Sequence, residues 1–329
     1  MKRNILITGA TGGLGLALTK RFCDAGYIVT ATGRNRSAGK RLADMGANFI
    51  AADLLDNGAA AALCVRQNSI IHAAALSDNQ GTPSAFNRAN IEATQKLLAA
   101  AQQAGCERFV YISSPSVYAS LTDQLDITEQ TPVASVPLNN YARTKLAAER
   151  LVLAANSAEF RTMALRPHAI IGPDDQVLLP KMLKMLEYGL LPLFRNGKAL
   201  VELTDVRDVA QAVWLAEQRI DVVAGKPVNI SGGSPLPIRE LAEGMAQAAN
   251  KPLRFVPVPM AIAKPLARIG EWCGSLSGYR YEPKLTRYIL STMAYDKTFG
   301  LSFAKEALGY LPQHDAFATL LAETRRRTS

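Results

Sequence analysis

Short apolar runs alternate along the first half of the chain with longer segments whose apolar residues recur three or four positions apart. The runs predict strands over residues 5–7, 27–32, 48–51, 69–72, 108–113 and 163–166. The longer segments predict amphipathic helices, for example over residues 90–104, where Ile91 and Leu98 share one face. Strands alternating with helices build a parallel sheet with helices on both faces, so we expect a doubly wound α/β fold.

The turn after the first predicted strand is rich in glycine, and a helical pattern that includes Leu18 and Phe22 follows it. Gly9 permits the tight turn, Gly12 the close approach of a phosphate, and Gly15 the packing of helix on strand. A pyrophosphate binds where a helix N-terminus exposes backbone N–H groups with no Cβ in the way. The context of strand, turn and helix therefore predicts a dinucleotide-binding loop. Its expected contact residues are Gly9, Thr11, Gly12, Gly13, Leu14 and Gly15.

The texture of the chain changes after Pro167, where proline and glycine become frequent and apolar segments become shorter. Residues 228–230 again have the composition of a buried strand. The chain therefore divides into two predicted domains. These are a dinucleotide-binding Rossmann domain over residues 1–166 and 201–232, and a smaller, discontinuous α+β substrate-binding domain over residues 167–200 and 233–329.

Composition narrows the partners. The chain has 329 residues and a formal net charge of +9, with a mean hydropathy of +0.03 and an isoelectric point near 9.4. A basic chain can bind nucleic acid, an anionic surface or anionic small ligands, but no segment resembles a zinc finger or a stacking platform, so we expect no nucleic acid and no metal. Four dispersed cysteines and an N-terminus that leads directly into a strand suggest a cytoplasmic protein without a signal peptide.

The candidate chemistry lies on one predicted helix and one strand end. Tyr141 and Lys145 are four residues apart, so both side chains project from one helix face. Ser114 follows the fifth predicted strand, and open α/β sheets bind ligands outside the carboxyl ends of their strands. We assign general acid/base catalysis to Tyr141, because Lys145 and an oxidised nicotinamide would lower the phenol pKa from about 10. Ser114 would hydrogen-bond the reacting substrate oxygen.

These motifs together resemble the extended short-chain dehydrogenase/reductase family over nearly the whole chain. The resemblance implies that Ser114, Tyr141 and Lys145 are catalytic and that Tyr141 and Lys145 also contact the cofactor. Further cofactor contacts implied by the resemblance are Asp53, Leu54, Ala73, Ala74, Ala75, Arg166 and Pro167. Other matching positions are Asn90, Gly172-Pro173 and Asp205-Val206-Arg207-Asp208-Val209. We place Leu76, Ser116 and His168 on the substrate side.

The C-terminal half resembles the 3β-hydroxysteroid dehydrogenase branch of that family. The matching segments are Glu282-Pro283-x-Leu285-Thr286-Arg287-Tyr288, Lys297-Thr298-Phe299 and Ala307-Leu308-Gly309-Tyr310-x-Pro312. This branch includes sterol-4α-carboxylate dehydrogenases and 2-alkyl-3-oxoalkanoate reductases. The resemblance implies an oxidoreductase that interconverts a secondary alcohol and a ketone on a small hydrophobic, steroid-like or 3-oxoacyl-like substrate.

Two other functions stay open. A nucleotide-sugar epimerase of the same fold is the first, although the family's sugar dehydratases carry an acidic pair where this chain has Ser114-Pro115-Ser116. A non-catalytic protein that senses NADP or acts as a scaffold is the second, and the intact serine, tyrosine and lysine set argues against it.

The end of the second predicted strand bears on the choice of cofactor. An NAD site places a carboxylate there to accept the ribose hydroxyls. This chain has Arg34 and no carboxylate in residues 31–36. Because a guanidinium can bond a 2′-phosphate, we expect NADP(H) to be preferred, with NAD(H) as the alternative.

Residues 256–274 form a further helical pattern, with Ile262, Leu266, Ile269 and Cys273 on one face and Pro265 as a potential interruption. The pattern predicts a helix packed on the second domain or, alternatively, an apolar lid facing a lipid-like substrate or a membrane surface. His72 is expected to pack at a strand end and His314 to lie on the surface. The family resemblance implies a homodimer formed through the helices that carry Asn90 and Tyr141.

Overall fold

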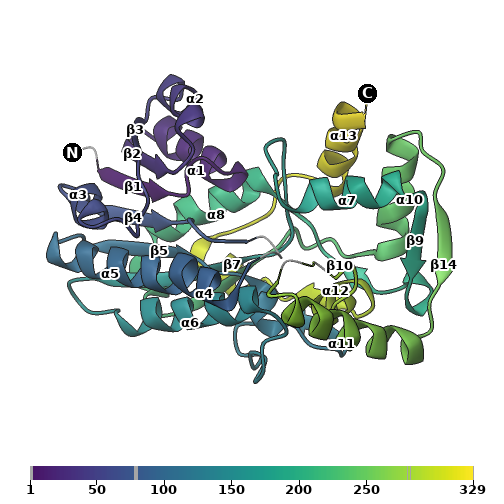
Figure 1. The fold of residues 1–329 in the computed structure, drawn as a ribbon. Helices are drawn as coiled ribbons and strands as arrows, with labels where there is room; N and C mark the ends of the chain where they lie inside the picture. The colour runs from purple at the N-terminus through teal and green to yellow at the C-terminus, as the bar shows by residue number, and fades with distance from the viewer. Residues whose placement is uncertain (1–2, 78–80, 280, 282, 329) are drawn as a thin grey trace.

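A computed structural model of the chain describes residues 3–77, 81–279, 281 and 283–328; Glu282 of the predicted C-terminal motif lies outside them. Seven parallel strands form the main sheet in the order β12-β7-β5-β4-β1-β2-β3 (Figure 1). They are β1 (Asn4–Thr8), β2 (Ile28–Gly33), β3 (Asn48–Ala51), β4 (Ser69–His72), β5 (Arg108–Ile112), β7 (Arg161–Pro167) and β12 (Pro227–Ile230). The predicted strands and the doubly wound α/β class are confirmed.

Helices cover both faces of this sheet. They are α1 (Gly13–Asp24), α2 (Gly39–Asp44), α3 (Ala59–Cys64), α4 (Pro83–Phe86), α5 (Ala93–Gln103), α6 (Asn140–Ala154), α8 (Val206–Gln218) and α9 (Ile220–Val223). On β1, Ile5 and Ile7 pack in the core beneath α1 and α8, whereas Leu6 packs in the core beneath α3, α5 and α6. Because both faces are buried, the strands are continuous apolar runs without alternation.

A second, four-stranded sheet has the order β13-β10-β15-β6. Its strands are β6 (Gln124–Ile127), β10 (Leu200–Val201), β13 (Leu236–Pro237) and β15 (Lys297–Phe299). β6 belongs to the predicted Rossmann segment, and β10 spans the predicted boundary at residue 200. Sequence analysis missed β6, which is short and partly exposed. The segment after β5 therefore contributes to both sheets, and the two-domain division itself stays a prediction.

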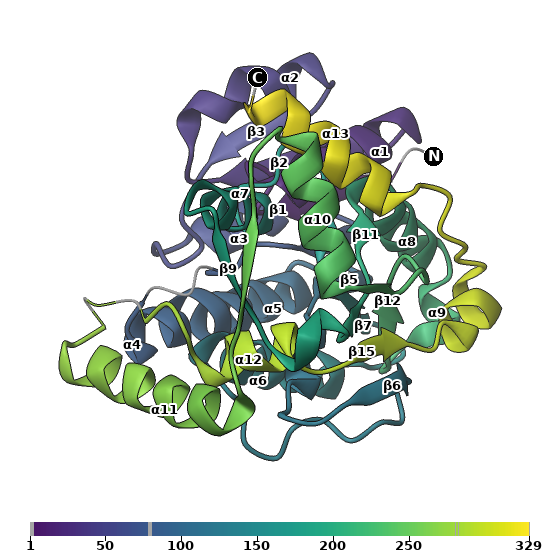
Figure 2. The same cartoon turned by 90° about the vertical axis from the view of Figure 1, so that its right-hand side faces the viewer.

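The remaining helices lie at the same end of the molecule as the second sheet (Figure 1). The helices are α7 (Leu178–Glu187), α10 (Ile238–Ala248), α11 (Met260–Leu276), α12 (Arg287–Met293) and α13 (Ala316–Thr328). Two separate strand pairs are β8 (Ile170–Ile171) with β11 (Thr204–Asp205) and β9 (Leu190–Leu193) with β14 (Arg254–Pro257). Short 3₁₀ or π turns are η1 (Arg36–Ala38), η2 (Asn87–Glu92), η3 (Pro115–Tyr118), η4 (Arg195–Gly197) and η5 (Ala304–Leu308). Figure 2 shows α10 and α13 side by side.

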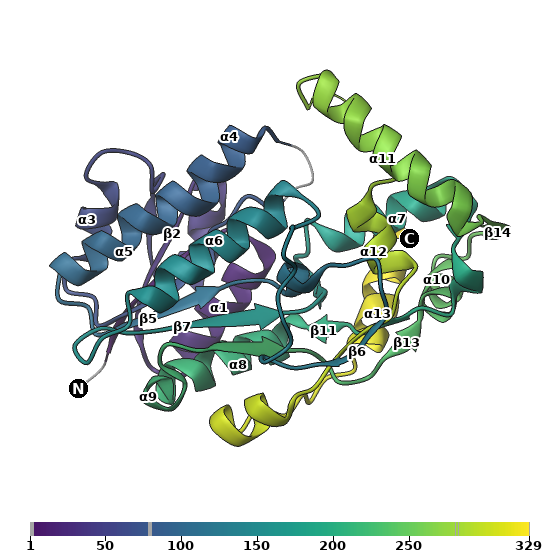
Figure 3. The ribbon, with the colours of Figure 1, turned by 90° about the horizontal axis from the view of Figure 1, so that it is seen from below.

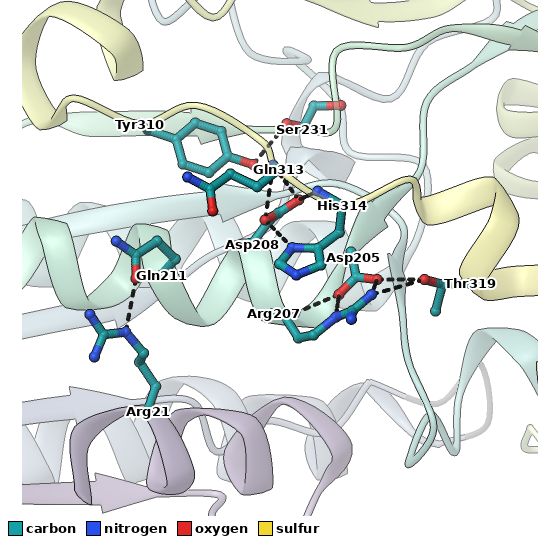
Figure 4. Close-up of polar contacts among 10 residues, drawn as sticks. All are labelled: Arg21, Asp205, Arg207, Asp208, Gln211, Ser231, Tyr310, Gln313, His314 and Thr319. Atoms are coloured by element: carbon teal, nitrogen blue, oxygen red, sulfur yellow. Dashed lines mark hydrogen bonds and ion pairs between the residues drawn. The ribbon is translucent and has the colours of Figure 1, made fainter. Parts of the chain in front are cut away.

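The Asp-Val-Arg-Asp-Val segment fastens the C-terminal part of the chain to α8 (Figure 4). The buried Asp208 carboxylate accepts the backbone N–H groups of Gln313 at 3.1 Å and His314 at 3.0 Å, and His314 Nδ1 lies 2.7 Å away. Asp205 accepts the Thr319 hydroxyl at 2.7 Å. This motif is structural, and it explains why His314, expected on the surface, is only partly exposed.

The helix predicted within residues 256–274 is α11, and it continues through Pro265 without a break. Its small residues Ala263, Ala267 and Gly274 are buried, whereas the predicted apolar face that contains Ile262 and Ile269 is exposed to solvent. The helix packs on α12 as expected, but it does so through these small residues and not through the predicted apolar face. Across the residues that the structure describes, no helix has the length and hydropathy needed to cross a membrane.

Candidate active site

One cavity of about 2140 Å³ runs from the glycine loop after β1 to α12 and collects nearly all the predicted site residues. It opens beside the carboxyl ends of β1 and β4, where the strand order reverses, as expected for a ligand of an open α/β sheet. Predicted residues that line it are Gly9, Thr11, Gly12, Gly13, Leu14, Gly15, Arg34, Asp53, Leu54, Ala73, Ala74, Ala75, Leu76, Ser114, Ser116, Tyr141, Lys145, Pro167 and His168.

The glycine loop has the shape that a pyrophosphate requires. Gly9 has a φ of +69°, and a Cβ there would lie 2.7 Å from the backbone nitrogen of Ala74. A Cβ on Gly15 would lie 2.1 Å from the carbonyl oxygen of Gly9, so only glycine lets the helix approach the strand. At Gly12 the nearest such atom is 3.6 Å away, which leaves room for a phosphate at the N-terminus of α1. The loop fits a dinucleotide.

A buried histidine holds the two strand ends together below this loop. His72 Nδ1 lies 2.7 Å from the Thr8 hydroxyl, and His72 Nε2 lies 2.9 Å from the Thr94 hydroxyl. The Thr8 oxygen also accepts the backbone N–H of Ala74. Burial lowers the pKa of His72 to about 3, with Lys145 as a second cause. The expected packing role of His72 is confirmed, and its polar bonds also set the position of the cavity wall.

Tyr141 and Ser114 both line the cavity. Tyr141 is the second residue of α6, whose start is fixed by Asn139, which accepts the backbone N–H of Ala142 at 2.8 Å. Ser114 precedes η3, and its Oγ accepts the backbone N–H of Ser116 at 3.2 Å. Burial raises the pKa of the Tyr141 phenol, and the nearby Ser114 side chain acts against that rise. The polypeptide alone therefore keeps the phenol protonated, ready to donate its proton.

Lys145 lies one turn after Tyr141 and is 2% exposed. Its ammonium donates to the carbonyl oxygen of Ile112 and lies 4.1 Å from the ring centroid of Tyr111. Burial lowers the pKa of Lys145 to about 7, and Glu149 opposes this shift. We expected Lys145 to lower the pKa of Tyr141. Within the polypeptide, the causes of the pKa shift of Tyr141 are instead burial and the Ser114 side chain.

The structure corrects the predicted cofactor role of Arg166. Its side chain is 4% exposed and forms a buried ion pair with Glu149, to which Nε donates at 2.9 Å. A further guanidinium nitrogen donates to the Tyr118 hydroxyl. Glu149 also accepts the Ser113 hydroxyl at 2.6 Å. Because its donors are used behind the cavity wall, Arg166 holds α6 against the strand ends that carry the site.

Glu149 is the functional neighbour that sequence analysis missed. It follows Tyr141 and Lys145 at the same four-residue spacing, so the signal was present in the helix periodicity. Asn90 was named only as a matching position, and its role is now visible. It is 1% exposed and bonds both the N–H and the carbonyl of Leu76, at 2.7 and 3.1 Å.

Comparison with known sequences identifies the family to which the chain belongs. Residues 5–231 match the NAD dependent epimerase/dehydratase family. The chain belongs to that family. A 2-alkyl-3-oxoalkanoate reductase of Stenotrophomonas maltophilia is 33% identical over 94% of this chain and 94% of its own. The human sterol-4-alpha-carboxylate 3-dehydrogenase (decarboxylating) is 32% identical over 53% of this chain and 51% of its own.

A solved structure, MoeE5 in complex with UDP-glucose and NAD, superposes with a TM-score of 0.75 at 25% identity. The match covers 99% of this chain and 100% of that chain. Together the relatives confirm the predicted branch and an NAD(P)-dependent oxidoreductase of the extended short-chain type.

The cavity lining also includes polar atoms without hydrogen-bond partners. Ser116 Oγ and His168 Nε2 are buried, and neither has a hydrogen-bond partner among the described residues. The His168 ring packs 4.7 Å from the Phe299 ring, centroid to centroid. Burial lowers the pKa of His168 to about 4, with Lys297 as a second cause. Both orphaned atoms are therefore free to bond a polar group of a substrate.

Two arginines line the cavity near the end of β2. Arg34 follows β2 and is 77% exposed, with Asp53 at 4.0 Å as a loose ion partner. Arg41 on α2 makes two bonds of 2.6 Å to the Asp174 carboxylate instead. The loop that carries Asp174 also covers the glycine turn, because a Cβ on Gly13 would lie 2.6 Å from its carbonyl oxygen. Arg34 is thus more available to a ligand than Arg41.

Proposed function

We propose that this protein interconverts a ketone and a secondary alcohol on a hydrophobic 3-oxoacyl-like or steroid-like substrate, with NADP(H) preferred over NAD(H). The observation that carries the proposal is the pair of Tyr141 and Ser114, which line the same cavity as the glycine loop. The apolar lining residues around the pair, such as Leu191, Phe194 and Leu285, suit a hydrophobic substrate.

Each residue has a defined task in this reaction. When bound, the nicotinamide supplies or accepts the hydride. In the direction of reduction Tyr141 donates its proton to the carbonyl oxygen of the substrate, and Ser114 donates a hydrogen bond to the same oxygen. Lys145 holds the nicotinamide ribose. Glu149 and Arg166 keep the α6 face in position.

Basic residues in the cavity lining favour a substrate with a carboxylate. Lys297 and His168 both line the cavity. Lys297 is 7% exposed, and burial lowers its pKa to about 8. A buried lysine gains an ion partner when a carboxylate enters. A 3-oxo acid presents that group two carbons from the reacting ketone, and the Stenotrophomonas relative is named for such a substrate.

Two alternative functions compare with this proposal as follows. The MoeE5 complex contains UDP-glucose, so a nucleotide-sugar epimerase stays the second candidate function. A protein that senses the dinucleotide without turnover would need no Tyr141–Ser114 pair and is disfavoured.

The proposal also includes a cytoplasmic homodimer formed through α5 and α6. Asn90 itself does not face a partner, because it is buried against Leu76 and Thr144.

The test measures oxidation of NADPH and NADH with 2-alkyl-3-oxo acids, their methyl esters, ketosteroids and bulky cyclic ketones. We expect turnover of ketones, with the acid preferred over its ester. Tyr141→Phe should lose at least about 10²-fold in turnover and keep its cofactor affinity. Tyr288→Phe is the matched control, since Tyr288 lines the same cavity. Conversion of UDP-sugars without net redox, or cofactor binding without any turnover, would overturn the proposal.

A further inference from the structure

Helix α11 exposes a continuous apolar stripe. Its members are Ile262, Leu266, Ile269, Trp272 and Leu276, which are 54, 50, 55, 65 and 67% exposed. At about 100° per residue these positions fall within roughly a third of the helix circumference. Figure 3 shows α11 along the outer edge of the molecule. Single exposed apolar residues are ordinary, but a full stripe of large ones marks an interaction surface.

The helix cannot turn to bury this stripe. Its opposite face consists of small residues, and Ala263, Ala267 and Gly274 are buried. A Cβ on Gly270 would lie 2.9 Å from the carbonyl oxygen of Leu285, so the helix lies directly on the following segment. Glu271 is fixed by Arg287, whose Nε donates to it at 2.7 Å. The orientation of α11 is therefore set by close packing, and the stripe faces outwards by construction.

Positive charge borders the stripe. Lys264 and Arg268 are exposed and lie one turn apart beside it on the helix surface. Lys284, also exposed, stacks 4.6 Å from the Tyr188 ring centroid near the cavity. Glu271, the acidic residue of α11, is already paired with Arg287. An apolar stripe with a basic flank complements a bilayer that contains anionic lipid.

The stripe also adjoins the cavity. Leu266 lines it from α11, together with Leu285 and Tyr288 from the segment that α11 packs on. A hydrophobic ligand could thus pass between a lipid phase and the cavity without crossing water. Contact with a second copy of the chain is less favourable, because a two-fold contact through this face would bring Lys264 and Arg268 of both copies together without free carboxylates.

We propose that α11 lies in the plane of a membrane, with its apolar stripe inserted among the acyl chains and with Lys264 and Arg268 on the phosphate groups of anionic lipids. The helix binds at the interface and does not cross the bilayer, which agrees with its exposed cations and with the hydropathy of the described helices. This surface stands independently of the proposed reaction, because its test uses no substrate.

The first experiment is co-sedimentation of the full chain with phosphatidylcholine vesicles, with and without phosphatidylglycerol. We expect binding to the vesicles that contain phosphatidylglycerol. Lys264→Glu with Arg268→Glu should lower that binding by roughly tenfold or more, and Ile262→Ser with Ile269→Ser should abolish it. The matched control is Val222→Ser with Leu311→Ser, two residues with 56 and 55% exposure outside α11. Thermal unfolding confirms that each variant is folded.

The second experiment uses Trp272 as a reporter. The chain has two tryptophans, and Trp214→Phe leaves Trp272 alone. Its emission should shift to shorter wavelength on anionic vesicles and be quenched by brominated acyl chains. Trp272→Phe keeps Trp214, which stacks on Arg21 and should show neither change. Failure to bind anionic vesicles, binding that the control variants lose equally, or a dimer that Ile269→Ser dissociates would overturn the proposal.

Discussion

The most informative residue is Tyr141, because its surroundings decide the direction of proton transfer. Burial raises the pKa of the phenol, and the counteracting group within the chain is Ser114 rather than Lys145. A nicotinamide in the oxidised state adds a positive charge beside the ring, which favours the phenolate. In the proposed reaction Tyr141 is therefore an acid in ketone reduction and a base in alcohol oxidation, and the charge of the cofactor selects between the two.

Arg34 should determine which cofactor is held. The change is Arg34→Ala, which removes a guanidinium that lines the cavity, is 77% exposed, and has Asp53 at 4.0 Å as a loose partner. A charged hydrogen bond to the 2′-phosphate is worth about 1.5–3 kcal/mol, so NADPH affinity should fall roughly ten- to a hundredfold while NADH affinity changes little. Calorimetric dissociation constants for both cofactors measure this.

The neighbouring Arg36→Ala is the matched control for that experiment, because Arg36 is not part of the cavity lining. Its cofactor affinities should stay near those of the wild type. Equal affinity of the wild type for NADPH and NADH, or an equal loss of both in Arg34→Ala, would show that the 2′-phosphate is not recognised at this position.

At the scale of elements, strand ends and one helix face produce the site. Tyr141, Lys145 and Glu149 recur every fourth residue on α6, and Arg166 at the end of β7 clamps the last of them. His72 does the same between the ends of β4 and β1. These buried polar bonds fix the separation between the glycine loop and the helix that carries Tyr141.

His72 should make the stability of this region sensitive to acid. Its pKa is about 3 in the folded chain and about 6.5 when unfolded. Between these values the unfolded chain binds a proton that the folded chain does not, so the free energy of unfolding falls as the pH drops below 6.5, by up to about 1.4 kcal/mol per pH unit. Urea unfolding of the wild type and His72→Gln at pH 6.5 and pH 5 measures this.

In that comparison His72→Gln should show the shallower pH dependence by about this slope, since it has no imidazole to protonate. His314→Gln serves as the control, because His314 is partly exposed and its ring faces a carboxylate. Identical pH dependence in the wild type and His72→Gln would contradict the prediction.

At the scale of the whole molecule, patterns that depend on local sequence were predictable and long-range pairings were not. The seven core strands and the α6 face follow from apolar runs and helical spacing. β6 could not be found, because Gln124–Ile127 is short and polar and becomes a strand only by pairing with β15, far along the chain. Arg166 was misassigned for the same reason. Its partner Glu149 becomes visible only when β7 and α6 are side by side.

The last prediction concerns how the C-terminal segment is held on the body of the molecule. The Asp208 carboxylate satisfies the backbone N–H groups of Gln313 and His314 and one nitrogen of the His314 ring. That turn leads to α13, whose Thr319 and Glu323 line the cavity. Asp208→Ala would remove the acceptor of these partly buried donors, and each bond to a charged group is worth about 1.5–3 kcal/mol. We expect a loss of about 3–5 kcal/mol in the free energy of unfolding, measured by urea denaturation, together with faster proteolysis of the C-terminal segment. Asp208→Asn keeps part of the acceptor and should lose less. The control is Asp221→Ala, which removes an exposed carboxylate paired with Arg161 and should cost at most about 1 kcal/mol. If Asp208→Ala unfolds like the control, the C-terminal segment is held by its apolar contacts alone, and the Asp-Val-Arg-Asp-Val motif needs another explanation.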